Sequence, residues 1–249
     1  IEKRFAIEVP TREEMQEIEL SSRLYDEDGA LFMTVSVLNK ANSDEPETTA
    51  ITFILVKKTL ITLRYADPVP FKTFIRRVNR SPSLASSAEA VLFGLLEQIV
   101  DRLADIMEQA AADLEGLSNI VFANPDDPAH DQDHRAVLRR IGRAGNLSGK
   151  AKDSLLNLHR LGLFLSTQMR LKKDAKTRLK TISRDIVSIT EHANFIANKV
   201  PPTLIASIYG MNFSVMPELD WQFGYPLAIG LMVLSAVLPL WYFKRKGWL

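Results

Sequence analysis

Three neighbouring residues, Gly210, Met211 and Asn212, are well suited to contacting an ion. The side-chain carbonyl of Asn212 is a neutral acceptor, and Gly210 lets the backbone turn and bring its own carbonyl close. Neutral oxygen acceptors of this kind can contact a hydrated cation through its waters. Asn212 repeated around a symmetry axis would form a ring of neutral acceptors. Met211 is apolar and flexible, and we expect it to pack the loop.

Aromatic and acidic residues surround this triplet in the stretch IYGMNFSVMPELDW, residues 208–221. We expect Tyr209 and Phe213 to anchor the helix end beside the turn. Glu218 and Asp220 would raise the local cation concentration at the mouth of a pore. The alternative interpretation of these two residues is that they are solvated loop acids.

The composition of the 249-residue chain is close to the globular average, with 46% apolar residues, 24% charged residues and a net charge of +1. Balanced charge without a polybasic tract argues against a nucleic-acid partner. The lack of cysteine excludes disulfides and thiolate metal sites. No Ser/His/Asp order, Glu-x-x-His pair or dinucleotide fingerprint supports an enzyme, and nothing indicates a resident cofactor.

The 21 residues Phe223–Phe243 contain no charged side chain. At ~1.5 Å per residue, a helix of this length crosses a hydrocarbon layer of ~30 Å. Aromatic residues lie at both ends, as they do at membrane interfaces: Trp221, Tyr225, Trp241 and Tyr242. This segment therefore predicts a membrane-spanning helix.

A basic tail, residues 244–249, follows this span and begins with Lys244, Arg245 and Lys246. Basic residues concentrate on the cytoplasmic side of membrane proteins, so we expect the tail there. The N-terminus lacks the apolar region of a signal peptide, which predicts a cytoplasmic N-terminal part as well. A chain with both ends on one side crosses the membrane an even number of times.

A second span can only come from residues 201–213, which are uncharged. These 13 residues of helix reach only ~20 Å, about two-thirds of the hydrocarbon core. The preceding residues cannot extend the span, because Glu191 and Lys199 would then be buried in lipid. We therefore interpret 201–213 as the truncated end of a first span, with residues missing between 200 and 201.

Residues 1–80 predict a small cytoplasmic α/β domain. Ala30–Leu38 and Ile51–Tyr65 are rich in β-branched and aromatic residues, and Lys57-Lys58 divides the second run into a hairpin. Val69–Arg80 predicts a helix whose apolar face is formed by Phe71, Phe74, Ile75 and Val78.

Residues 81–200 change to a helical period and predict long helices. The first runs from about Ser86 to Ile120, and the second from about Arg135 to Met169, where Gly145-Asn146 can interrupt it. A stalk helix over 175–200 carries a coiled-coil-like heptad seam: Leu179, Ile182, Ile186, Ile189, Ala193, Ile196 and Val200. The seam predicts packing either against the chain's own helices or around a symmetry axis.

The stretches on either side of the predicted span resemble the CorA family of magnesium transport proteins. The match lies in YGMNF (209–213), in MPEL with a following tryptophan and GYP (216–226), and in YFKRKGWL (242–249). The order of parts agrees over the whole chain. The sequence departs from the family at Val200/Pro201, where members continue the stalk into a first span some tens of residues longer.

The resemblance implies a funnel-shaped homopentamer with a two-span helical transmembrane domain in a bacterial-type inner membrane. The first span would line the pore, 214–222 would form the extracytoplasmic loop, and Gly210, Met211 and Asn212 would form the selectivity filter. Mg²⁺ would be the transported and regulatory ion, with Co²⁺ and Ni²⁺ as secondary ions. The implied partners are further copies of the chain and membrane lipid.

Acidic side chains in the cytoplasmic domain of this family sense intracellular Mg²⁺ and hold the pore shut when occupied. The matching stretch is QEIELSS, residues 16–22, with Glu17 and Glu19 as candidate ligands. A charged face on an amphipathic helix explains these acids equally well.

Two other functions stay open beside a gated Mg²⁺ channel. One is a zinc-transporting relative of the same family, against which the MPEL pattern argues. The other is a membrane-anchored helical scaffold without transport. A tether needs neither an even number of spans nor a polar Asn at the turn, so we favour the channel.

Overall fold

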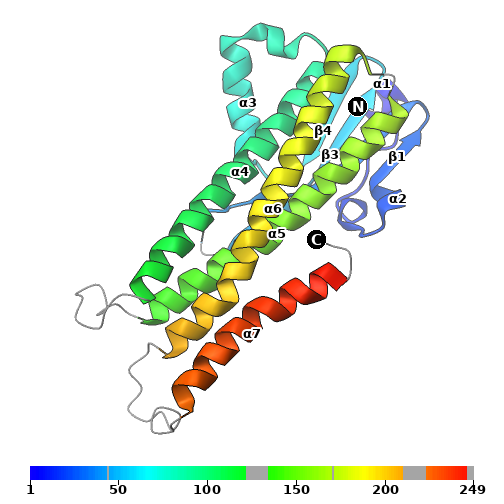
Figure 1. Cartoon of the computed structure of the whole chain (residues 1–249). Coiled ribbons are helices and arrows are strands. Elements are labelled where there is room, and N and C mark those ends of the chain that lie inside the picture. The colour runs from blue at the N-terminus through cyan, green and yellow to red at the C-terminus, as the bar shows by residue number, and fades with distance from the viewer. Residues whose placement is uncertain (44, 122–133, 170, 210–222, 246–249) are drawn as a thin grey trace. The chain divides into compact units, whose positions relative to one another are not determined.

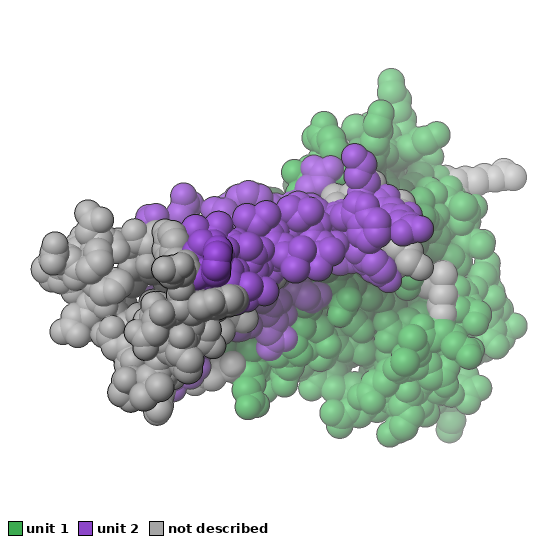
Figure 2. Space-filling view, turned by 60° about the horizontal axis from the view of Figure 1, so that its bottom comes forward, with its two compact units in different colours: residues 1–106, 150–190 green, residues 107–149, 191–249 purple. Residues whose placement is uncertain are grey.

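The computed structural model of the chain describes residues 1–43, 45–121, 134–169, 171–209 and 223–245. The chain divides into two compact units, which Figure 2 shows in different colours. Unit 1 comprises residues 1–106 and 150–190, and unit 2 comprises residues 107–149 and 191–249.

An antiparallel sheet in the order β1-β2-β3-β4 lies in unit 1 (Figure 1). Its strands are β1 Leu24–Glu27, β2 Ala30–Asn39, β3 Glu47–Val56 and β4 Thr59–Arg64. Alternate residues of a strand point to opposite faces. A cluster of buried residues on one face joins the N-terminal segment to the sheet and consists of Ile7, Ala30, Phe32, Ile54 and Val56. On the opposite face, Phe53 stacks on Phe71 of the helix Val69–Arg80, with ring centroids 6.3 Å apart.

The predicted hairpin is confirmed, because β3 and β4 pair on either side of Lys57-Lys58. Lys57 adopts a positive φ of 55°, as a tight turn requires. Strand β3 begins at Glu47 rather than at the predicted Ile51, since residues 47–50 also pair with β2. Strand β1 and three short helices were not predicted: α1 Glu2–Phe5, the 3₁₀ helix η1 Glu14–Gln16 and α2 Leu20–Arg23.

Helix α3 (Val69–Arg80) has the predicted bounds and is followed by the 3₁₀ helix η2 (Pro82–Ala85). Phe71 and Phe74 are buried, whereas Ile75 is 55% exposed, so the predicted apolar face is too wide. The ring of Phe74 lies against Gly94 of the next helix. A Cβ atom at Gly94 would lie 2.3 Å from Cε2 of Phe74, so only glycine permits this close approach.

The predicted long helices are α4 (Ala88–Val121), α5 (His134–Gln168) and α6 (Lys173–Tyr209). Helix α5 passes Gly145-Asn146 without a break, so the expected interruption is wrong. Five residues of the α6 seam are buried within the chain: Leu179, Ile182, Ile186, Ala193 and Ile196. Of the two interpretations of this seam, packing against the chain's own helices is therefore the one observed.

Polar contacts fasten the long helices within unit 2. The hydroxyl of Ser148 on α5 donates to the backbone carbonyl of Ala193 on α6 at 2.7 Å. Arg140 of α5 pairs with Asp113 of α4 at 3.3 Å. The last helix of the chain is α7 (Gly224–Arg245).

Candidate functional site

In the amino-acid sequence, the predicted filter falls between two helices. Tyr209 is the last residue of α6, and α7 begins at Gly224. The remaining residues of the predicted filter and its mouth lie outside the described part of the chain: Gly210, Met211, Asn212, Phe213, Glu218 and Asp220. The elements that position them are therefore α6, α7 and the contacts that fix α6 within unit 1.

Helix α7 exposes apolar side chains along its length. Among the described helices it alone combines the length and the composition needed to cross a membrane. A core helix of a soluble protein would bury these side chains, but here their exposed fractions lie between 40 and 56%. The exposed set is Leu227, Ile229, Leu231, Val233, Leu234, Val237, Leu238, Leu240, Trp241 and Tyr242. This surface is suited to lipid or to neighbouring membrane helices.

The polar groups of α7 also suit a membrane helix. The hydroxyl of Ser235 donates to the carbonyl of Met232 at 2.8 Å, so its polar group is satisfied within the helix. The guanidinium of Arg245 lies 5.3 Å from the centroid of the Trp241 ring, an aromatic–cation pair of the kind found at membrane interfaces. Lys244 shares the last turn with Arg245. Lys246 lies outside the described residues.

Helix α6 runs through Pro201-Pro202 without a break. A proline has no N–H to donate, so the carbonyls of Ala197 and Asn198 lack their usual helical donors. Proline is favoured in the first turn of a helix, where those donors have no partner anyway. Pro201-Pro202 therefore lie in the interior of a helix, although a proline pair is better suited to a helix start.

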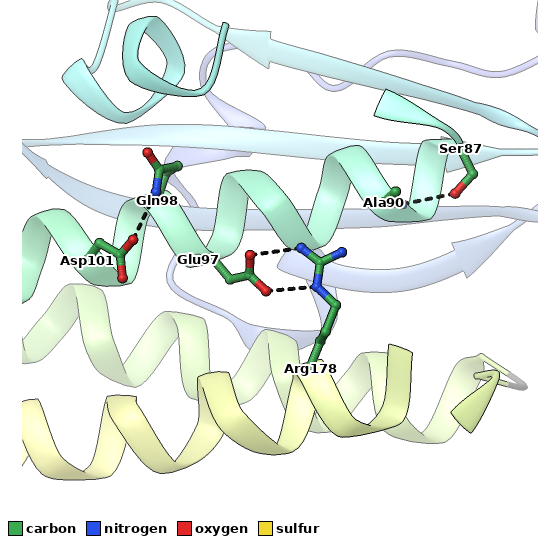
Figure 3. Close-up of polar contacts among 6 residues, drawn as sticks. All are labelled: Ser87, Ala90, Glu97, Gln98, Asp101 and Arg178. Carbon is green, nitrogen blue, oxygen red and sulfur yellow. Dashed lines mark hydrogen bonds and ion pairs between the residues drawn. The ribbon is translucent and has the colours of Figure 1, made fainter. Parts of the chain in front are cut away.

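A bidentate ion pair connects α6 to α4 within unit 1 (Figure 3). Nε and Nη2 of Arg178 donate to the two carboxylate oxygens of Glu97, each at 2.8 Å. The same guanidinium lies 5.7 Å from the centroid of the Phe93 ring. Hydrogen bonding to Glu97 raises the pKa of Arg178, although burial acts in the opposite direction. The pair fixes the beginning of α6 against α4.

Asp101 lies one turn beyond Glu97 on α4 and accepts a hydrogen bond from Nε2 of Gln98 at 2.9 Å (Figure 3). Burial raises the pKa of Asp101, and Arg77 lowers it. Three further carboxylates also raise the pKa of Asp101, namely Glu97, Asp105 and Asp185. These acids do not form a pattern in the sequence, because Asp185 lies on α6 and only helix packing brings it near.

The predicted regulatory acids, Glu17 and Glu19, are exposed and lie between η1 and α2 rather than in a helix. Their interpretation as the charged face of an amphipathic helix is therefore wrong. Glu17 borders a hollow of about 520 Å³ together with other acids: Glu8, Glu14, Asp26 and Glu27. Within the described ranges, no group of three or more His, Asp or Glu residues is placed to hold a metal ion.

Comparison with known proteins identifies a family. The family model of the CorA-like Mg²⁺ transporter protein matches residues 1–200 and 199–245. The magnesium transport protein CorA of Wolinella succinogenes is 32% identical over 279 residues, which cover 98% of this chain and 85% of that protein. The protein of the same name from Campylobacter jejuni is 30% identical over 287 residues, covering 100% of this chain and 86% of that protein.

A solved structure resembles the chain in its fold. The soluble domain of CorA from Methanocaldococcus jannaschii superposes with a TM-score of 0.60 at 13% identity, covering 79% of this chain and 76% of that one. The α/β domain with long helices is thus the architecture of that soluble domain.

Proposed function

This chain belongs to the family of CorA-like Mg²⁺ transporter proteins, and we propose that it forms a gated channel for hydrated Mg²⁺ in a bacterial-type inner membrane. The family transports ions and is not a family of enzymes. The observation that carries the proposal is α7, an exposed apolar helix of membrane-crossing length that begins shortly after the Gly-Met-Asn stretch in the sequence. Such a helix supports a position of that stretch at a membrane surface.

The chemistry of the filter follows from its residues. Asn212 would present a neutral carbonyl from each subunit of a homopentamer, and the ring would contact the waters of Mg²⁺ rather than strip them. An inward membrane potential is worth ~2.3 kcal/mol per charge per 100 mV, so about twice that for a divalent ion. Uptake then needs no ATP, and Glu218 and Asp220 would concentrate the cation at the entrance.

Gating requires that the cytoplasmic domain act on the helix that leads to the filter. Helix α6 is that element, since it begins in unit 1 and ends at Tyr209. The Arg178–Glu97 pair joins the beginning of α6 to α4, and the seam residues Leu179, Ile182 and Ile186 are buried. We place closure by intracellular Mg²⁺ in the cytoplasmic domain, with Glu17 and Glu19 as the ligands to be tested first.

The first span would be completed by residues that this chain lacks between 200 and 201. Three observations support this proposal. The family model matches in two pieces that meet at 199–200. The Campylobacter alignment has 287 positions for 249 residues, so about 38 of its positions have no counterpart in this chain. The proline pair also lies in the interior of α6, although it would be better suited to a helix start.

Intact-mass measurement of the protein purified from its native cells tests whether a segment is missing between residues 200 and 201. We expect an intact mass above 28.0 kDa, because the natural first span should be longer. A mass of 28.0 kDa would show that the segment is absent from the protein itself.

Ion flux tests the proposed function. The natural protein in liposomes should admit Mg²⁺, and to a lesser degree Co²⁺ and Ni²⁺, when the interior is made negative. Preference for Zn²⁺ would favour the zinc-transporting alternative. Correct insertion with no flux of any divalent ion would favour the membrane-anchored scaffold.

A further inference from the structure

A polar cavity of about 440 Å³ opens on unit 1, on the side of the sheet where β3 begins. The buried Met15 belongs to its lining, while the other lining residues are mostly polar and include Ser36 of β2 and residues 47–50 of β3. Arg12 and Gln16 come from the segment around η1, Arg23 from α2, and Tyr65 from the end of β4. The volume suits a small molecule, since such sites commonly measure ~300–1,000 Å³.

Arg23 brings a positive charge into this cavity without a matching carboxylate. Its Nη1 donates to Oδ1 of Asn157 at 2.8 Å and to the hydroxyl of Ser36 at 3.3 Å. Its Nε donates to the backbone carbonyl of Glu17. These three acceptors are neutral, and no ion pair of Arg23 is found in the described part of the chain. Burial lowers the pKa of Arg23, and the nearby Arg160 lowers it further.

Arg12 supplies a second guanidinium to the same cavity. It lies 5.4 Å from the centroid of the Tyr65 ring, and this contact holds it at the cavity lining. One acid, Glu47, also lines the cavity, but its carboxylate already contacts Nζ of Lys40 at 3.1 Å and Nδ2 of Asn39 at 3.4 Å. The cavity therefore holds more positive than negative charge.

We propose that this cavity binds a soluble phosphate-bearing anion through Arg12 and Arg23. Guanidinium groups bind phosphate oxygens in a bidentate manner, and an anion would supply the countercharge that Arg23 lacks. Gln16 and Thr49 add neutral hydrogen-bonding groups around the same space. The size of the cavity leaves room for a diphosphate or for the polyphosphate end of a nucleotide. None of its lining residues belongs to the predicted filter or its mouth.

Isothermal titration calorimetry of the full chain in detergent tests the proposal, with sodium pyrophosphate and ATP as probes in Mg²⁺-free buffer. We expect saturable binding of at least one probe, weakened at least tenfold by Arg12→Gln and by Arg23→Gln. The matched control is Arg76→Gln, which removes an exposed arginine of α3 outside the cavity and should leave binding unchanged.

Equal affinity for the two probes would show that the phosphate groups alone are recognised. Tighter binding of ATP would show that the nucleoside is recognised as well. Thermal melting checks that each variant is folded. If Arg23→Gln does not fold, Arg12→Gln decides, because Arg12 is exposed. Absence of binding to both probes would overturn the proposal, as would binding that Arg12→Gln leaves unchanged in a folded protein.

Discussion

The contact between Arg178 and Glu97 is the clearest polar connection between α6 and the rest of unit 1. Its geometry is bidentate, and the two side chains are 34% and 33% exposed. Exposed ion pairs contribute little to the free energy of unfolding, but a well-oriented, half-buried guanidinium–carboxylate pair contributes more.

We expect Arg178→Ala and Glu97→Ala to destabilise the protein, with a coupling free energy of about 1 kcal/mol in a double-mutant cycle. Thermal or urea unfolding in detergent measures it. Arg184→Ala is the matched control on α6, since Arg184 is 79% exposed and lies 3.8 Å from its partner Asp185. A coupling energy near zero would mean that this pair does not fix α6.

Asp101 predicts a pH dependence of stability. Its folded-state pKa is raised, with burial as the largest cause, so the folded protein binds a proton at Asp101 more readily than the unfolded chain does. Stability from this residue is therefore present at pH values below the ordinary carboxyl pKa and is lost as the pH rises through the raised value.

Asp101→Asn should accordingly raise the unfolding temperature at pH 7 and have little effect near pH 3. The variant keeps a carbonyl oxygen that can accept the hydrogen bond from Gln98. Melting curves at the two pH values test this. An equal effect at both would show that charge is not responsible.

Sequence patterns predicted residues in continuous stretches better than residues that meet in space. The helix Val69–Arg80 and the hairpin at Lys57-Lys58 were predicted because their neighbours in sequence carry the signal. The acids around Asp101 come from α4 and α6, and no periodicity of either helix shows which faces meet. For Glu17 and Glu19 the local interpretation was wrong, since a helical face was considered for residues that are not helical.

At the scale of elements, the helices were predicted well because each carries a long apolar period. The bounds of α3 were predicted correctly, and those of α4 closely. Short elements such as β1 and α2 were missed, since four residues each give too little pattern. The uninterrupted path of α5 through Gly145 shows that tertiary packing overrides a weak propensity.

Gly94 of α4 lies against the ring of Phe74 on α3, and it yields a matched pair of substitutions. Gly94→Ala would place a methyl group 2.3 Å from the Phe74 ring, so we expect a loss of about 1–3 kcal/mol of stability. Gly116→Ala in the same helix meets nothing within 4 Å and should stabilise by about 0.5–1 kcal/mol. Unfolding measurements in which the two substitutions act alike would contradict this packing.

For the whole molecule, the buried seam of α6 bears on how subunits associate. Ile186 is 3% exposed within the single chain, whereas its neighbour Val187 is 49% exposed. The seam is therefore occupied before any second copy arrives, and the proposed pentamer must use other surfaces.

Ile186→Asp should unfold the chain, because it buries an unpaired charge. Val187→Asp should leave the fold of the chain intact. Circular dichroism follows the fold, and light scattering in detergent follows the oligomer. An Ile186→Asp protein that is folded but monomeric would show instead that the seam joins subunits around a symmetry axis.

We propose that hydrated Mg²⁺ passes a ring of Asn212 side chains. The most direct measurement is potential-driven Mg²⁺ influx into liposomes that contain the natural protein, its Asn212→Leu variant or the control Asn79→Leu, which replaces an exposed residue of α3. We predict rapid influx for the natural protein and the control, and loss of influx for Asn212→Leu with assembly unchanged. Undiminished influx through an assembled Asn212→Leu protein would contradict the account.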